Sequence, residues 1–249
     1  MKALILAAGR GTRIQSVHGN HPKCLIRFNG TNSTILDHQI ECLYAAGITN
    51  IGIVVGYEKN QIIQHVAKHY SDHRRFCFIE NPLFAKTNNI YSFWLARTWL
   101  NGEPFMCLNG DVVFDPRILI PAVRPDSPIT MIVDSAWRDE TMKVVISKNR
   151  IVQMNKRIPQ TEFSGTYIGI TSFSAGVQEE LFAKVNHLIQ TGRENEFFNV
   201  AVQQLTDEGL HVGFTSTGDL PWAEIDDPGD LAFARLYVFP RLTSRSIAA

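Results

Sequence analysis

A glycine-containing loop with two nearby cations follows the first apolar segment of the chain. The sequence GRGTR occupies positions 9–13 directly after that segment, and Lys23 follows Pro22 about ten residues later. Glycines let the backbone approach a ligand closely, and successive backbone amides in such a loop can cradle phosphate groups. Arg13 can clamp phosphate oxygens with two hydrogen bonds, whereas Lys23 acts as a point charge. These residues predict a polyphosphate-binding loop.

The loop differs from two common phosphate-binding motifs. A Walker A loop ends in Lys-Ser or Lys-Thr, which is absent here, and a dinucleotide fingerprint has a third glycine where this chain has Ile14. The broken fingerprint disfavours a nicotinamide-dependent oxidoreductase. A tight turn with surface cations is the alternative for the two glycines alone. Arg13 and the Pro22-Lys23 pair favour phosphate binding.

Strand-like and helix-like segments alternate through the first half and would position this loop. Short apolar runs predict strands over Lys2–Ala7, Ile51–Val55, Phe76–Ile79 and Pro104–Leu108. Helical spacing of apolar residues predicts helices over Ile35–Ala46, Glu58–Tyr70 and Asn89–Leu100. This order predicts an α/β fold with a Rossmann-like, doubly wound, mostly parallel sheet and helices on both faces. Ligands of such sheets bind at the carboxyl ends of the strands.

The second half is richer in strands, which predicts a mixed or antiparallel lobe. Strands are expected over Ile129–Val133, Lys143–Ile146, Ile151–Met154 and Tyr167–Phe173, and helices over Gly176–Ile189, Glu196–Glu208 and Pro228–Val238. We expect a single domain over residues 1–241, with one half to about residue 125, a second over about 126–241, and a loose tail over 242–249.

Composition narrows the function classes. The chain has 249 residues, with 24 Lys and Arg against 24 Asp and Glu and a pI near 7.1, which disfavours binding to nucleic acid or an anionic membrane. Its four cysteines form no CxxC pair, which is typical of reduced thiols. No apolar run is long enough to span a membrane, and the apolar opening is too short for a signal peptide. These features favour a cytoplasmic protein.

Several motifs resemble one enzyme superfamily. LAAGRGTR at positions 6–13, followed by PKCL at 22–25, resembles the signature of nucleotidyltransferases that join a nucleoside triphosphate to a phosphorylated sugar or alcohol. The resemblance continues through NGD at 109–111, GTYIGI at 165–170 and WAEIDDPGDL at 222–231. It implies a nucleotide-diphospho-sugar transferase fold, with a nucleotide-binding first half and an acceptor-binding second half. It also implies catalytic roles for Arg13 and Lys23, and nucleotide contacts from Leu6, Ala8, Gly9, Gly11 and Thr12.

The resemblance further implies a metal site on two distant aspartates. Asp111 follows the fourth predicted strand, and Asp226 follows a short strand near the C-terminus. Mg²⁺ prefers oxygen ligands and typically takes one or two carboxylates plus phosphate oxygens. A turn residue is the alternative for Asp111. Because Asp227-Pro228 fits a helix cap with proline at the first position, we assign the cap to Asp227 and the metal to Asp226.

The segment after the third strand bears on the choice of nucleotide. Asn81-Pro82 and Thr87-Asn88-Asn89 are similar to a segment of cytidylyltransferases that act on phosphocholine, aminoalkylphosphonates and related esters. A QPxGL-like run, more frequent in the sugar-phosphate enzymes, is absent. An asparagine amide offers a donor and an acceptor to a pyrimidine edge, so Asn88 is a candidate contact to the base or ribose. Capping of the following helix is an equal alternative.

Candidate acceptor contacts lie in the second half. Lys156 is expected to hold the acceptor's phosphate, and Glu196 could assist an amine. Four aromatic residues could form a cage for a quaternary ammonium, although most aromatic residues are simply core; they are Trp137, Tyr167, Phe197 and Trp222.

A series of three histidines at helical spacing is a second candidate for metal binding. His65, His69 and His73 recur every four residues, but no cysteine or carboxylate cluster accompanies them. A solvated helix face is the favoured interpretation.

The sequence thus predicts a Mg²⁺-dependent cytidylyltransferase that acts on a small phosphate or phosphonate ester such as phosphocholine, phosphoethanolamine or 2-aminoethylphosphonate. A sugar-1-phosphate enzyme using UTP, GTP or dTTP is the alternative, and a non-catalytic nucleotide-sensing subunit is a remote one. A homodimer is compatible with this class, whereas nucleic acid is not an expected partner.

Overall fold

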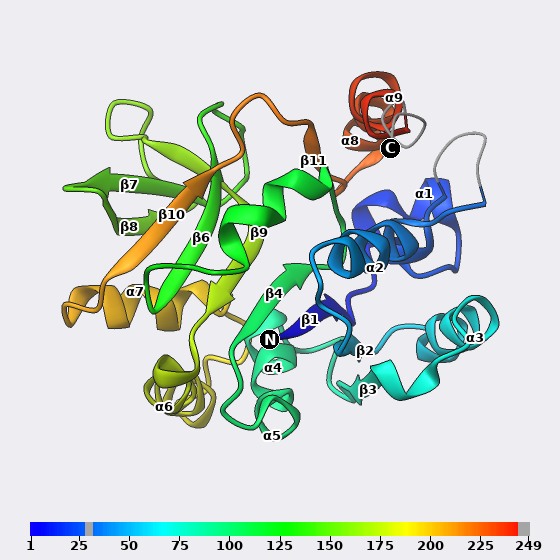
Figure 1. Cartoon of the computed structure of the whole chain (residues 1–249), viewed down its shortest axis with the longest axis horizontal. Helices are drawn as coiled ribbons and strands as arrows, with labels where there is room; N and C mark the ends of the chain where they lie inside the picture. The colour runs from blue at the N-terminus through cyan, green and yellow to red at the C-terminus, as the bar shows by residue number, and fades with distance from the viewer. Residues whose placement is uncertain (28–31, 244–249) are drawn as a thin grey trace.

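A nine-stranded mixed sheet runs through both halves of the chain in the computed structural model, which describes residues 1–27 and 32–243 (Figure 1). The strands follow the order β3-β2-β1-β4-β9-β6-β10-β8-β7. They are β1 (Lys2–Ala7), β2 (Ile51–Val55), β3 (Phe76–Glu80), β4 (Phe105–Asn109), β6 (Ile129–Asp134), β7 (Lys143–Ser147), β8 (Arg150–Asn155), β9 (Gly165–Phe173) and β10 (Val212–Ser216).

The first four strands of the sheet are parallel, as the alternation of strands and helices predicted. β1 pairs with β2 on one side and with β4 on the other, and β2 pairs with β3. Leu6 of β1 is in register with Asn109 of β4. The carboxyl ends of these two strands therefore lie side by side, and the loops that follow them meet.

Helices cover both faces of this half-sheet, because alternate residues of each strand point to opposite sides. Ala3 and Ile5 of β1 belong to the apolar core under α2 (Ile35–Ala45) and α3 (Lys59–His69). Leu4 belongs to the core on the other face, which holds the apolar residues of α4 (Asn89–Leu95), α6 (Gln178–Gln190) and α7 (Asn199–Asp207). The doubly wound prediction is confirmed.

The second half is mixed rather than purely antiparallel. β9 runs antiparallel to both β4 and β6, and β7 and β8 form an antiparallel pair. β10, a strand that was not expected from the sequence, runs parallel to β6.

A separate two-stranded sheet joins the middle of the chain to its C-terminal part. β5 (Val112–Phe114) pairs antiparallel with β11 (Trp222–Glu224), with Glu224 opposite Val112. The amide of Ile225 extends the pairing by donating to the carbonyl of Asp111 at 3.0 Å. The residues on either side of this pair are thereby brought together from positions more than a hundred apart.

Three helix predictions need correction. The segment Asn89–Leu100 forms two helices, α4 and α5 (Arg97–Leu100), because the amide of Ala96 bonds back to Phe93 in a tight turn. The helix expected from Glu196 starts at Asn199, since the carbonyls of Glu194 and Glu196 accept from the start of α4.

The C-terminal segment is also less regular than expected. After α8 (Pro228–Phe233), the chain forms a π-helical turn over Ala234–Val238 and then α9 (Phe239–Thr243). Leu242, expected in a loose tail, thus belongs to a helix, and the rest of that tail, from residue 244, lies outside the described residues. Near the glycine loop of residues 9–13, α1 spans Gln15–His18. Across residues 1–27 and 32–243, no helix has the length and apolar character needed to cross a membrane.

Candidate active site

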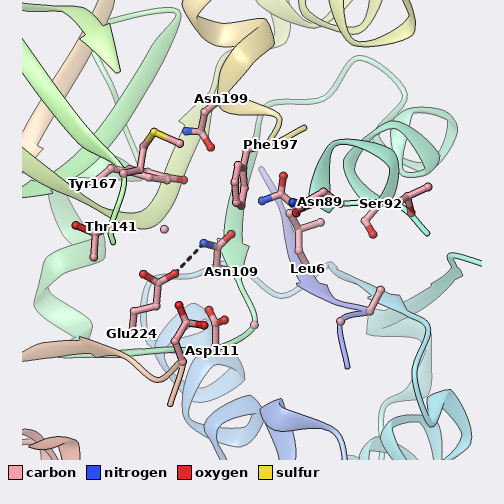
Figure 2. A pocket seen from close by; sticks show the side chains of 18 of the residues that line it. Leu6, Asn89, Ser92, Asn109, Asp111, Thr141, Tyr167, Phe197, Asn199 and Glu224 are labelled. Carbon is pink, nitrogen blue, oxygen red and sulfur yellow. Dashed lines mark hydrogen bonds between the residues drawn. The ribbon is translucent and has the colours of Figure 1, made fainter. Parts of the chain in front are cut away.

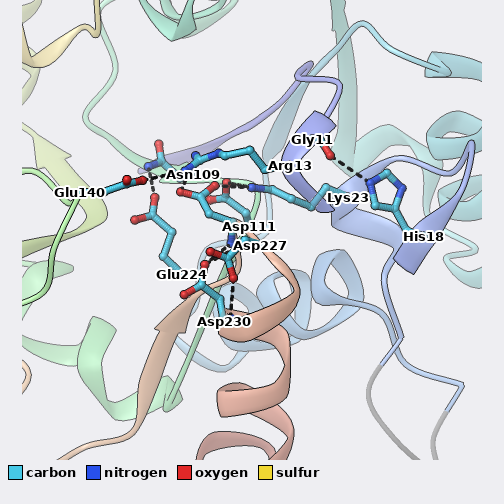
Figure 3. A network of polar contacts seen from close by, with 11 residues as sticks. Gly11, Arg13, His18, Lys23, Asn109, Asp111, Glu140, Glu224, Asp227 and Asp230 are labelled. Carbon is cyan, nitrogen blue, oxygen red and sulfur yellow. Dashed lines mark hydrogen bonds and ion pairs between the residues drawn. The ribbon is translucent and has the colours of Figure 1, made fainter. Parts of the chain in front are cut away.

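The loop after β1 has a backbone that depends on glycine. Gly11 adopts a φ of +61°, in the left-handed region that favours glycine, and precedes a 3₁₀ turn over Thr12–Ile14. A Cβ at Gly11 would lie 3.1 Å from the Cβ of Lys23, so the loop packs directly against the lysine. A ring nitrogen of His18 lies 3.2 Å from the Gly11 carbonyl and steadies the turn (Figure 3).

A second glycine, Gly110, lets the ends of β1 and β4 lie close together behind the loop. The amide of Gly110 donates to the carbonyl of Leu6 at 3.0 Å, which continues the β1–β4 pairing past the end of β4. A Cβ at Gly110 would lie only 2.8 Å from that carbonyl oxygen. Gly110 therefore permits the close approach that places Asp111 beside the glycine loop.

Lys23 stands at the centre of a cluster of ion pairs (Figure 3). Its Nζ lies 2.6 Å from Asp111 Oδ2 and 2.7 Å from Asp226 Oδ1. Arg13 approaches the other oxygen of Asp226 at 2.8 Å and also reaches Glu140 at 3.4 Å. The β5–β11 pair explains how the two aspartates meet, because Asp111 immediately precedes β5 and Asp226 lies just beyond β11.

The electrostatics of the cluster favour its charged forms. Burial lowers the pKa of Lys23, but the carboxylates of Asp111 and Asp226 outweigh burial and hold that pKa above its usual value. Burial raises the pKa of Asp226, but Lys23 and then Arg13 outweigh it and leave the pKa below the usual range. The site is thus an ionised network.

A third carboxyl group, from Glu224, adjoins this network and was not predicted. Its Oε1 accepts from the Asn109 amide at 3.5 Å (Figure 2). Burial, together with the charges of Asp111 and Asp226, raises the pKa of Glu224 to about 8. Glu224 and Asp226 are two residues apart at the end of a strand, and side chains at that spacing share a face. This spacing of two residues is the sequence feature from which Glu224 could have been predicted.

The aspartate pair has the chemistry of a divalent-cation site. The Oδ1 atom of Asp111 is buried and has no hydrogen-bond partner within the described residues. Carboxylate oxygens are the preferred ligands of Mg²⁺, which commonly takes one or two of them and completes its shell with phosphate and water. No group of three or more His, Cys, Asp or Glu in residues 1–27 and 32–243 is arranged as a full protein metal site. Two aspartates plus a nucleotide fit that pattern.

A pocket opens from this cluster toward the second half of the chain (Figure 2). Ten of the residues singled out from the sequence line it, namely Leu6, Ala8, Gly9, Arg13, Asn88, Asp111, Lys156, Tyr167, Phe197 and Asp226. Gly11 and Lys23 line a smaller cavity that shares Leu6, Gly9, Gly110 and Asp111 with the pocket. Residues of the pocket that were not assigned roles from the sequence include Asn89, Asn109, Thr141, Asn199 and Glu224.

Four of the proposed residues do not line either cavity. Thr12 is exposed beside the glycine loop. Glu196 pairs with Arg193 at 3.2 Å on the surface. Trp137 packs edge-on against Phe163. These placements separate the residues from the pocket that their sequence positions suggested.

Trp222 is the fourth and is a core residue. It is 3% exposed, and its indole N–H donates to Asp134. The four aromatic residues considered for a cage are therefore not gathered in one place, since only Tyr167 and Phe197 line the pocket.

Asn88 caps a helix and also lines the pocket, so the cap is confirmed and the contact to the base or ribose stays a prediction. It is the N-cap of α4, with its side-chain oxygen accepting from the Asn89 amide at 2.7 Å, and it also lines the pocket. Because the side-chain oxygen of Asn88 accepts this hydrogen bond at the start of the helix, the Nδ2 group is left to donate to a ligand.

The expectation that the three histidines form a solvated helix face is wrong for His65, which has a structural role. His65 is not a solvated residue, because its Nε2 lies 2.8 Å from Asp37 of α2 and its side chain is 14% exposed. His69 stacks against His65 with ring centroids 4.3 Å apart.

Comparison with known proteins supports the enzyme class. The chain is 25% identical over 256 residues to the CTP:phosphoglutamine cytidylyltransferase of Campylobacter jejuni, covering 93% of this chain and 98% of the relative. It is 35% identical over 246 residues to the 2-aminoethylphosphonate cytidylyltransferase of Lancefieldella rimae, covering 95% and 93%. Longer curated relatives also match, and the chain spans 37% and 55% of the length of two of them.

Solved structures share the same architecture. The inositol-1-phosphate CTP transferase of T. maritima superposes with a TM-score of 0.83 at 24% identity, over 100% of this chain and 97% of the other. This similarity confirms the predicted fold. The MobA-like NTP transferase domain matches residues 3–161, well over half of the chain. The chain therefore belongs to the MobA-like NTP transferase family.

Proposed function

We propose that this chain is a Mg²⁺-dependent cytidylyltransferase that transfers CMP from CTP to a small phosphate or phosphonate ester and releases pyrophosphate. The observation that carries the proposal is the position of Lys23, held by Asp111 and Asp226 beside the glycine loop at 2.6 and 2.7 Å. The names of the two cytidylyltransferase relatives, one acting on phosphoglutamine and one on 2-aminoethylphosphonate, support the choice of CTP and of a phosphorus-containing acceptor.

In the proposed reaction, an oxygen of the acceptor's phosphate or phosphonate attacks the α-phosphorus of CTP. A new P–O bond forms to that phosphorus, and the bond to the β-phosphate oxygen breaks, so pyrophosphate leaves with the electron pair. Phosphoryl-type transfer asks little covalent chemistry of the protein. Positioning and charge stabilisation are the main contributions expected from the side chains.

The glycine loop and its cations have distinct tasks in this scheme. The amides of Gly9, Gly11 and Thr12, with Arg13, bind the triphosphate. Lys23 stabilises the charge that develops around the α-phosphate, which requires it to exchange a carboxylate oxygen for a phosphate oxygen. Lys156 orients the acceptor's anionic group.

Asp111 and Asp226 would hold Mg²⁺ when it is bound. The ion would supply charge neutralisation and a common anchor for both reactants. Asn88 would contact the base or ribose through its free amide donor. The proposed setting is the cytoplasm, where a nucleoside triphosphate is at hand, and the oligomeric state stays a prediction.

The experiment measures pyrophosphate release with Mg²⁺ while varying the nucleotide. CTP, UTP, GTP, ATP and dTTP are each combined with phosphoethanolamine, 2-aminoethylphosphonate and several sugar-1-phosphates. We expect release with CTP and a small amino-alcohol ester or phosphonate. Release only with a sugar-1-phosphate and UTP, GTP or dTTP would replace the proposal by the sugar-nucleotide alternative. Nucleotide binding without release from any pair would favour the nucleotide-sensing alternative.

A further inference from the structure

The two cations already assigned to the phosphate site are both paired with carboxylates (Figure 3). Lys23 lies 2.6 Å from Asp111 and 2.7 Å from Asp226, and Arg13 pairs with Asp226 and with Glu140. Two positive charges therefore face three negative ones in this cluster. Before a metal ion binds, an anionic nucleoside triphosphate meets no excess of positive charge there.

Arg10, which lies between the two glycines of the loop, is held in a different way. Its guanidinium lies 5.6 Å from the centre of the Tyr57 ring, and it forms no ion pair with a carboxylate in the part of the chain that the structure describes. An aromatic face attracts a cation through its quadrupole but carries no net charge. Tyr57 therefore positions Arg10 without neutralising it, and the guanidinium keeps its charge for a ligand.

The position of Tyr57 beside the glycine loop is fixed by the backbone after β2. The Tyr57 amide donates to the carbonyl of Ala8 at 3.0 Å, across the ends of β1 and β2. Gly56 allows this approach, because a Cβ there would lie 2.8 Å from the same oxygen and 2.7 Å from the Cβ of Phe84. The Tyr57 ring packs edge-on against Phe84, which lines the pocket, with ring centroids 6.3 Å apart. The ring that holds Arg10 is thus attached to the pocket wall.

Lys156 shows the same arrangement in the second half of the chain. Its Nζ lies 4.9 Å from the centre of the Phe197 ring, and it pairs with no carboxylate among residues 1–27 and 32–243. Lys156 is the residue proposed to bind the acceptor's anion. Arg10 is the corresponding cation beside the glycine loop.

The order of the strands indicates which phosphates Arg10 would reach. Asp111 follows β4, the glycine loop follows β1 and Tyr57 follows β2, and these strands are neighbours in the order β2-β1-β4. The α-phosphate is assigned to Lys23, which pairs with Asp111 on the β4 side. Arg10 extends to the β2 side. The β- and γ-phosphates carry most of the charge of the nucleotide, and a guanidinium can bind two of their oxygens at once.

We propose that Arg10 binds the β- and γ-phosphates of the nucleotide and, after the reaction, the pyrophosphate, and that the Tyr57 ring holds the Arg10 side chain in position for them. The inference rests on the proposed function and adds a phosphate-binding residue to it. The charge of Arg10 also attracts the anionic nucleotide toward the loop before it binds.

Three cytidine nucleotides that differ only in the number of phosphates test the inference. Isothermal titration calorimetry measures the Kd of CMP, CDP and CTP for the wild type and for Arg10→Gln at one Mg²⁺ concentration. We expect Arg10→Gln to raise the Kd of CTP by at least ~10-fold, the scale of a lost charge-assisted hydrogen bond, and to leave that of CMP within ~2-fold. Arg10→Lys keeps the charge but not the fork of donors and should give an intermediate Kd for CTP. Equal weakening of CMP and CTP, or no weakening of either, would overturn the inference.

Arg97→Gln is the matched control, because Arg97 also lies on an aromatic ring without a carboxylate partner among the described residues. Its guanidinium lies 3.6 Å from the centre of the Trp94 ring, and it does not line the pocket. The variant changes the net charge as Arg10→Gln does and should leave all three Kd values unchanged.

Variants of Tyr57 test the role of the ring. Tyr57→Leu should raise the Kd of CTP by ~2- to 5-fold, the scale of an exposed cation–π contact, whereas Tyr57→Phe keeps the aromatic face and should bind CTP as the wild type does. Equal Kd values for the two variants would contradict the role assigned to the ring.

Binding and turnover together separate this inference from the proposed function. Wild-type protein that binds CTP without releasing pyrophosphate with any acceptor would contradict the proposed function, and the binding series would still decide the role of Arg10. If UTP, GTP or dTTP binds in place of CTP, the mono-, di- and triphosphates of that base should show the same pattern. Wild-type protein that binds none of these triphosphates would contradict both claims.

Discussion

At the scale of single residues, the site depends on the balance between two cations and a set of acidic side chains. The Lys23 side chain is 14% exposed and forms ion pairs with two aspartates, one from the middle of the chain and one from its C-terminal part. Arg13 and Lys23 could be recognised from the sequence because the loop that carries them is contiguous. Glu224 was not predicted, although it lies two residues before Asp226 and so shares a face with it. The predicted aromatic cage was wrong, because the sequence shows which residues are aromatic but not where they lie or which cations of the chain contact their rings.

Removal of either partner in the central ion pair should stop turnover without unfolding the protein. We expect Lys23→Ala and Asp226→Ala each to lose more than ~10²-fold in kcat, the scale of a lost charge-stabilising group. Steady-state pyrophosphate release measures the loss, and thermal midpoints with Mg²⁺ present check the fold. Lys59→Ala is the control, because Lys59 pairs with Glu80 away from the pocket at 2.7 Å. Near-normal turnover of Lys23→Ala would refute its role.

At the scale of elements, the sequence predicted the long segments and the short strand before Asp226, but not β5 or β10. The periodicity and length of the apolar segments were sufficient to predict β1, β2, α2 and α3. β5 and β11 are three residues each, too short for any periodicity, yet their pairing is what joins Asp111 to Asp226. The meeting of the two aspartates was therefore implied by the resemblance alone and has its physical cause in a pairing that no local pattern marks.

The addition of one methyl group at Gly110 should disturb the close approach of β1 and β4. Gly110→Ala would place a Cβ 2.8 Å from the Leu6 carbonyl oxygen, so backbone must shift at the strand ends. We expect a loss of about 1–3 kcal/mol in the free energy of unfolding, as for other overpacked sites, and a raised KM for the nucleotide. Denaturant unfolding and initial rates measure the two effects.

Gly176→Ala is the matched control for that substitution, because a Cβ there meets no atom within 4 Å. It should leave both the unfolding free energy and the KM close to the wild type. Equal behaviour of the two alanine variants would contradict the steric argument for Gly110.

The junction between α2 and α3 should give the protein a characteristic acid sensitivity. Burial opposes ionisation of Asp37, but hydrogen bonds from His65 and Thr34 prevail and lower its pKa from 3.8 to about 2. A depressed carboxyl pKa contributes stability that is complete above pH 3.8 and is lost as the pH falls through about 2. Asp37→Asn should therefore cost roughly 2 kcal/mol at pH 7, and the gap to the wild type should close toward pH 2. Urea titrations across this range test it, and a gap independent of pH would contradict the assignment.

At the scale of the whole molecule, one continuous sheet carries the glycine loop on its parallel part, and residues from its mixed part line the other side of the pocket. The fold class was predictable because the alternation of strands and helices extends over more than a hundred residues. The strand order of the second half was not predictable, since β10 returns to pair with β6 only after three further strands and two α-helices. The site lies where the two parts meet.

Metal dependence is the prediction that belongs to this scale, because the two aspartates proposed as ligands come from the middle of the chain and from its C-terminal part. Removal of divalent ions with EDTA should reduce turnover by at least ~10²-fold, and an excess of Mg²⁺ should restore it. Pyrophosphate release before and after chelation measures the change. Full activity in EDTA would exclude a metal role for Asp111 and Asp226.

The most direct test of the central claim follows the phosphorus atoms themselves. ³¹P NMR of the enzyme with CTP, Mg²⁺ and phosphoethanolamine should show the acceptor resonance replaced by the coupled pair of a new diphosphate, with pyrophosphate appearing in equal amount. That result would establish attack of the acceptor on the α-phosphorus. Conversion of CTP to CMP and pyrophosphate, or to CDP and phosphate, with the acceptor unchanged would contradict the account.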